Sequence, residues 1–162
     1  MAAPTATQGN GALAMRVTDL IAQDHRRVRA LFLELERMAA GDGERRALLD
    51  RIVDELDVHA RAEEDVFYPA VRATSRRIDD AEAGHAYLRN AIAAFRALDV
   101  ECADFTLGVR LIRGIVLSHV LEEESGILMD AQRLGGDELE RLGASMQERK
   151  EALTRSRGKR AA

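Results

Sequence analysis

Four histidines and two glutamates form a regular pattern along this chain of 162 residues. The histidines are the only four in the sequence, and they come in two pairs whose members are 34 residues apart. A glutamate follows the second histidine of each pair by four residues, so both side chains would project from one face of a helix. Imidazole and carboxylate groups are common metal ligands. The pattern therefore predicts one metal site of six residues: His25, His59, Glu63, His85, His119 and Glu123.

Chain reversals between the histidines would bring them to one level. The midpoints of the three intervals between successive histidines fall at Asp42, Arg72 and Cys102. Asp42 stands between two glycines, which break a helix and favour a turn. Turns at these three points would place the four imidazoles side by side. A shift of 60 residues also superimposes the first pair on the second and matches Arg29 with Arg89.

Apolar residues recur at helical spacing around the ligand candidates. Ile21 and Val28, for example, lie on the same helical face as His25. Two prolines and no tryptophan, against abundant Ala, Leu, Arg and Glu, favour helices over strands. We therefore expect an all-α protein. The expected helical segments are about 17–39, 44–71, 78–95, 111–127 and 137–154.

Composition excludes several classes of partner. The 24 basic and 28 acidic residues are interspersed, so the sequence has no basic stripe of the kind that binds nucleic acid. No apolar run reaches the length of about 18 residues that predicts a membrane span, and no segment resembles a signal peptide. A single cysteine cannot form an internal disulfide. We expect a cytoplasmic protein without nucleic-acid or membrane partners.

Buried carboxylates explain why the pattern indicates a metal. A lone histidine in a core is more often structural than a ligand, but four at one level reverse that expectation. Two inward-facing carboxylates at the same height would repel each other unless a cation neutralised them. Arg29 and Arg89 could supply charge, but they would leave the histidines unexplained. Four nitrogens and two carboxylates are too many ligands for one tetrahedral zinc ion and suit two iron ions bridged by carboxylates.

Other polar residues near the pattern are not predicted to be ligands. Glu64, Glu122 and Glu124 turn away from the histidines on a helical wheel and are expected to be solvated surface charges. Tyr68 and Tyr87 fall on the opposite sides of their helices, which argues against a tyrosinate ligand. Cys102, in a predicted loop, is expected to be a bystander thiol.

The ordered set of histidines and His-x-x-x-Glu pairs, with the segment Glu63–Pro69 after the first pair, resembles the hemerythrin-like family of HHE cation-binding domains. The resemblance covers about residues 15–130. It implies an up-and-down four-helix bundle that holds two non-haem iron ions with an oxo or hydroxo bridge. In that arrangement each histidine is a terminal ligand, and Glu63 and Glu123 bridge the two ions.

One position departs from the oxygen-carrying hemerythrins. Their third helix carries His-x-x-x-His, whereas Arg89 stands four residues after His85 in this chain. The resemblance thus implies one terminal nitrogen fewer and more room for water or peroxide. Simple reversible oxygen transport is less strongly indicated than in those relatives.

The expected organisation has four parts. A disordered segment precedes the bundle, an additional helix follows it and packs against the bundle or a second subunit, and a mobile basic tail ends the chain. Their boundaries are 1–14, 15–135, 136–154 and 155–162.

Three functions remain open from the sequence. The first is a di-iron protein that binds or reacts with dioxygen or peroxide in oxygen or iron sensing or in oxidative stress. The second is a catalase-like enzyme that disproportionates hydrogen peroxide, or a protein that reacts with nitric oxide. The third is a metal-free helical interaction module. The sequence leaves the oligomeric state open.

Overall fold

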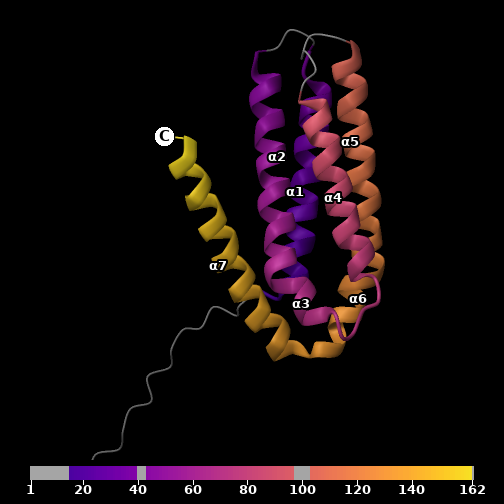
Figure 1. Cartoon of the computed structure of the whole chain (residues 1–162), viewed down its shortest axis with the longest axis vertical. Helices are drawn as coiled ribbons and strands as arrows, with labels where there is room; N and C mark the ends of the chain where they lie inside the picture. The colour runs from indigo at the N-terminus through magenta and orange to yellow at the C-terminus, as the bar shows by residue number, and fades with distance from the viewer. Residues whose placement is uncertain (1–14, 40–42, 97–102, 162) are drawn as a thin grey trace, which may run out of the picture.

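Four antiparallel helices form a bundle, and a fifth long helix packs against its side (Figure 1). The computed structural model describes residues 15–39, 43–96 and 103–161, and these contain no strand. The all-α prediction is confirmed. The expected disordered segment 1–14, the turn at Asp42 and the loop at Cys102 lie outside the described residues. The main helices are α1 (Val17–Arg37), α2 (Glu44–Ala62), α4 (Ile78–Phe95), α5 (Ala103–Glu122) and α7 (Gly136–Ala161).

The second and fourth bundle helices each contain one wide turn. A π-helical segment, η1 (Glu63–Phe67), joins α2 to α3 (Tyr68–Val71), and the Tyr68 N–H donates to the Glu63 carbonyl five residues back. A second such segment, η2 (Glu123–Ile127), joins α5 to α6 (Leu128–Ala131) in the same way. Single π turns inside helices are rare and often mark functional sites. Here each wide turn begins at a predicted metal-binding glutamate.

The apolar core consists of two clusters separated by a polar layer. One cluster fills the end of the bundle near Val28 and Leu56, and the other fills the end near Ile21 and Phe67. His25 lies between Ile21 and Val28 on α1. The sequence therefore places the polar layer between two water-excluding regions. This arrangement keeps the candidate ligands in a medium of low polarity.

The last helix extends further than the sequence suggested. We expected a mobile basic tail from Arg155, but α7 continues to Ala161. Arg157 forms ion pairs with Asp54 and Asp57 of α2, which hold this last part against the bundle. Leu139 and Met146 are fully buried against the bundle. Within the described residues, no helix is long and apolar enough to span a membrane.

Candidate metal centre

The six residues singled out by the sequence lie together in the middle of the bundle. Each of the four long bundle helices contributes one histidine, and each π segment contributes its first residue as a glutamate. Both glutamates are completely buried, and the His119 side chain, the most exposed of the histidines, is 10% exposed. The structure thus brings together His25, His59, Glu63, His85, His119 and Glu123.

Each glutamate lies between two histidines, one from the first pair (His25 and His59) and one from the second pair (His85 and His119). Glu63 places Oε1 3.2 Å from His59 Nε2 and Oε2 3.4 Å from His85 Nε2. Glu123 Oε2 lies 3.2 Å from His25 Nε2 and 3.5 Å from His119 Nε2. Both carboxylates therefore span the two halves of the site, which is the arrangement that a bridging ligand needs.

The ligand atoms fall into two overlapping groups. His25, His59, Glu63 and Glu123 offer atoms that all lie within 4.8 Å of one another, and so do Glu63, His85 and His119. We call the first group site A and the second site B. Glu63 belongs to both. The geometry accommodates two neighbouring cations that share a carboxylate.

Several polar atoms in this cluster have no hydrogen-bond partner although they are buried. Burying an unpaired polar group is costly, and burying an unpaired charge is more so. A cation would satisfy all of these atoms at once, so the residues fit a metal. The atoms in question are the Nε2 atoms of His25, His59 and His119, both carboxylate oxygens of Glu63 and Oε2 of Glu123.

Glu64 and Glu124 orient two of the histidines. His85 Nδ1 lies 3.0 Å from Glu64 Oε1, and His25 Nδ1 lies 3.0 Å from Glu124 Oε1. A carboxylate on Nδ1 fixes the ring and leaves Nε2 facing the site. The prediction that Glu64 and Glu124 are solvated surface charges is wrong. A position turned away from its own helix's inner face can still face the neighbouring helix.

The repeated arginines hold these two glutamates. Arg89 donates to Glu64 at 2.9 Å, and Arg29 donates to Glu124 at 3.3 Å. Each arginine follows a histidine by four residues, so histidine and arginine contact one carboxylate from the same helix. Arg89 thus occupies the place of a fifth histidine without entering the site.

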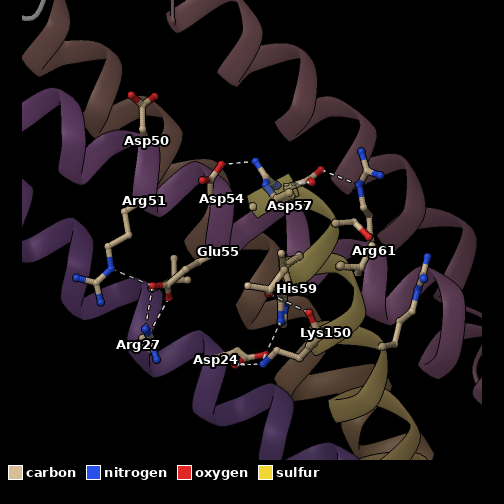
Figure 2. Close-up of a pocket in the computed structure, with 18 of the residues that line it drawn as sticks. Asp24, Arg27, Asp50, Arg51, Asp54, Glu55, Asp57, His59, Arg61 and Lys150 are labelled. Atoms are coloured by element: carbon tan, nitrogen blue, oxygen red, sulfur yellow. Dashed lines mark hydrogen bonds and ion pairs between the residues drawn. The ribbon is translucent and has the colours of Figure 1, made fainter. Parts of the chain in front are cut away.

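His59 has a different partner, which the sequence did not indicate. Its Nδ1 lies 3.1 Å from Asp24 Oδ2, and Lys150 of α7 donates to both Asp24 oxygens at 2.6 and 2.7 Å. Figure 2 shows this chain of contacts at the base of a surface groove between α2 and α7. Lys150 lies 126 positions from Asp24 along the chain, so only the fold reveals the contact.

Tyr68 points into the site rather than away from it. Its hydroxyl donates to Glu123 Oε1 at 2.5 Å and lies 3.5 Å from His85 Nε2. The prediction that Tyr68 faces away from the histidines is wrong, because it assumed an unbroken α-helix. The π segment adds one residue to the turn before Tyr68 and rotates its ring inward. Tyr87, by contrast, is 63% exposed.

The two halves of the repeat differ at two positions beside the ligands. Gly84 takes the position of Asp24 in the second half, and Leu128 takes that of Tyr68. A Cβ at Gly84 would lie 3.0 Å from His119 Nδ1, so the glycine admits the ring but supplies no carboxylate. Site A therefore has the Asp24 charge behind it, and the Tyr68 hydroxyl lies between Glu123 of site A and His85 of site B.

Charge within the cluster shifts its pKa values in the state without metal. Burial opposes protonation of His25 and His85, but the neighbouring Glu123 and Glu63 prevail and raise both pKa values. Burial lowers the pKa of His119. Burial and the two carboxylates raise the pKa of Tyr68, so its phenol remains protonated and donates to Glu123. The carboxylates that would hold a cation thus also favour the protonated forms of His25 and His85.

A small apolar cavity adjoins the histidines. Its volume is about 20 Å³, which is room for about one water-sized molecule. Besides the four histidines, its lining includes Leu56, Leu88, Val116 and Val120. A small uncharged ligand would fit this space beside the candidate metal positions.

Comparison with known proteins agrees with this geometry. The model of the hemerythrin HHE cation-binding domain matches residues 16–131. The chain therefore belongs to the hemerythrin HHE family. The cluster of histidines and glutamates is therefore the candidate metal-binding site of this domain.

Individual relatives differ in how much of their length is matched. A protein of Mycobacterium tuberculosis, named uncharacterized protein Rv2633c, is 26% identical to this chain. The match covers 86% of this chain and 88% of the length of that protein. A DNA nickase of Nostoc sp. is 32% identical over 74% of this chain, which spans only 34% of that relative. A crystal structure of an HHE cation-binding domain-containing protein from Mycobacterium kansasii superimposes with a TM-score of 0.81 at 24% identity. It covers 88% of this chain and 89% of its own, and it supports the fold.

Proposed function

We propose that this protein holds two non-haem iron ions and reacts with dioxygen or hydrogen peroxide. The observation that carries the proposal is the set of buried, unpaired histidine and glutamate atoms that converge on two overlapping groups. Nitrogen and carboxylate ligands without thiolate suit iron better than structural zinc. Bound iron would supply one-electron and two-electron chemistry with small oxygen species.

The protein's own residues divide the work of holding the ions. His25 and His59 would bind one ion, His85 and His119 the other, and Glu63 and Glu123 would bridge them. Glu64, Glu124 and Asp24 hold the rings so that Nε2 faces inward. The phenol of Tyr68 is placed to bind at site B or to hold a proton beside it.

The apolar cavity favours small, uncharged ligands. Dioxygen, hydrogen peroxide and nitric oxide are all compatible with about 20 Å³ bounded by leucine and valine side chains. Water excluded by the two apolar clusters cannot compete freely for the site. We do not propose nucleic acid as a partner, because the basic residues are interspersed with acidic ones.

A second function is supported by the position of Arg89. Because Arg89 contacts Glu64 instead of supplying a fifth imidazole, the two sites offer four histidines rather than five. More of the coordination of the ions is then left to solvent or substrate, and this favours turnover of peroxide over simple carriage of oxygen. A catalase-like activity is therefore the alternative that we propose to test beside oxygen binding.

The decisive experiment begins with metal analysis. Purified protein loaded with ferrous iron without air should hold two ions per chain, and mixing with oxygen should produce a visible absorption band. Peroxide added to the oxidised protein should release oxygen at an electrode if the catalase-like reading holds. His119→Ala should lose the iron at site B and either activity. The exposed Glu122→Gln serves as the matched control.

A different outcome would overturn the di-iron proposal. If iron and chelators leave the unfolding temperature of the protein unchanged and the purified chain contains no metal, the helical interaction module is the better description.

A further inference from the structure

The surface groove between α2 and α7 reaches the back of the metal site (Figure 2). Its volume is about 1250 Å³, and α1, α2 and α7 all contribute to its walls. His59 lies at its base, next to Asp24 and Lys150. The His59 side chain is 8% exposed, whereas those of His25 and His85 are 3% and 2% exposed. The groove therefore brings solvent close to one of the candidate ligands.

Three residues belong both to this groove and to the small cavity beside the histidines. Asp24, Val28 and His59 line the two spaces. Lys150 holds Asp24, and Asp24 in turn holds the ring of His59. Val28 is 4% exposed, and its apolar side chain forms no hydrogen bond that would have to break. Val28 is therefore the part of the shared wall that a small molecule can pass when the helices fluctuate.

The shared wall lies in the first half of the repeat. All three of its residues come from α1 and α2, which are the helices that α7 packs against. A shift of 60 residues places Leu88 at the position of Val28. Leu88 lines the inner cavity but not the groove. The packing of α7 thus gives the first half a feature that the repeat alone does not predict.

The outer wall of the groove is held mainly by charges. α7 buries Met146, but none of residues 147–159 is buried, and Leu153 is half-buried. Arg157 pairs with Asp57 at 2.6 Å across the groove. Ion pairs between partly exposed side chains contribute only about 0–1 kcal/mol. This half of α7 can therefore move outward at low cost and widen the groove.

The charges that line the groove largely neutralise one another. Arg27 and Arg51 both pair with Glu55, and Arg61 pairs with Asp57. A groove of paired charges has no strong field that would attract an ion or exclude a neutral molecule. It suits the same small, uncharged ligands as the apolar cavity behind it.

We propose that dioxygen or hydrogen peroxide enters the metal site through the groove between α2 and α7, and that Val28 limits this entry. The proposal rests on the proposed function and adds the route and the residue that controls it. A competing route passes the His119 side chain, which is 10% exposed and does not line the groove.

The first test needs no metal. Cys102 is the only cysteine of the chain, so Cys102→Ser leaves a background without thiols. In it, Val28→Cys should react with methyl methanethiosulfonate, a small uncharged reagent, at least about tenfold faster than Val116→Cys, because thiol reactivity depends on access. Val116 is the matched control, since it lines the cavity from α5 but not the groove. Mass spectrometry follows the labelling, and circular dichroism verifies the helices.

The two possible entrances predict opposite orders of labelling. Val116 lies three residues before His119 on α5, so faster labelling of Val116→Cys would indicate entry beside His119 and overturn the proposal. Equal rates at the two positions would also overturn it, because the groove would then offer no preferred access.

The second test uses protein loaded with ferrous iron. Val28→Phe should slow the absorption change on mixing with dissolved oxygen about tenfold at unchanged iron content, because the larger ring fills the space between groove and cavity. Ala93→Phe, at an exposed position of α4, should react like the native chain. A native rate in Val28→Phe would overturn the proposal. If the native chain binds no iron, the proposed function fails, and the labelling rates alone decide whether the groove gives access. They also decide if Val28→Phe does not fold.

Discussion

The hydroxyl of Tyr68 lies 2.5 Å from Oε1 of Glu123, across the interface between α3 and η2. This contact joins α3, which directly follows the first π segment, to the second π segment at the centre of the bundle. Since Tyr68 is fully buried, the hydrogen bond forms in the absence of water. A neutral donor to a buried carboxylate is among the stronger hydrogen bonds in proteins.

Tyr68→Phe should keep the ring packing and remove this donor. We expect the protein without metal to lose roughly 1.5–3 kcal/mol of stability, because a hydrogen bond to a charged group is lost. Iron should be lost more readily from this variant than from the native protein, because Glu123 loses the donor that orients it. Urea unfolding and metal analysis after partial chelation measure both effects. Tyr87→Phe, at an exposed position, should leave both unchanged.

Glu64→Gln and Glu124→Gln should weaken iron binding while leaving the fold intact. Each glutamate accepts from the Nδ1 of one histidine, and loss of such a partner lowers metal affinity by roughly 10-fold to 100-fold. Competition with a chromophoric chelator gives the affinities. Glu122→Gln removes a neighbouring exposed glutamate and should have no effect. Equal losses in all three variants would contradict the roles assigned to Glu64 and Glu124.

Asp24→Asn tests the contact chain from α7 to the site. It removes the charge behind His59 and the partner of Lys150, so iron at site A should bind about tenfold more weakly. The same chelator assay measures this change, with the exposed Asp19→Asn on α1 as control. An unchanged affinity would show that Asp24 anchors α7 without influencing His59.

Metal-loaded and metal-free protein should respond to pH in opposite directions. The raised pKa values of His25 and His85 mean that their protonated forms stabilise the metal-free fold fully below the ordinary value of 6.5. That contribution is lost as pH rises through the raised values. His119, whose pKa is lowered, acts the other way but is one group against two. Iron needs neutral imidazole, so acidification releases it.

The measurement is the unfolding midpoint at pH 6 and pH 8 with and without iron. Iron should raise the midpoint more at pH 8 than at pH 6. If the increment from iron is the same at both pH values, protons and metal do not compete for these histidines.

Much of this architecture could be predicted because a single helical period governs it. The spacing of His25, His59, His85 and His119 among apolar residues is sufficient to predict four helices with their histidines at one level. His-x-x-x-Glu identifies the two glutamates because residues four apart share a face. These relationships are local to one helix or follow from chain reversal.

The site residues that could not be predicted depend on contacts between helices, which the pattern of a single helix does not reveal. Glu64 and Glu124 appear solvated on their own helices and contact histidines on others. Tyr68 points inward because of the wide turn before it, and no residue type in Glu63–Phe67 predicts such a turn. Lys150 reaches Asp24 only through the packing of α7 on the bundle. Sequence periodicity therefore predicts the histidines and glutamates at the centre of the site. It does not predict the side chains that orient them.

The wide turns also make this bundle sensitive to the length of its own helices. Deleting one residue from Glu63–Phe67 would remove the extra residue of the wide turn and leave the helix after it close to its present orientation. Deleting one residue from the regular turns of α2 would instead rotate everything after it by about 100° around the axis. Tyr68 would stay in the core in the first case and leave it in the second. Single deletions should consequently disturb the bundle less in η1 and η2 than in the regular turns of α2 and α5, so the wide turns are the places where such helices can change length while the helices keep their orientation.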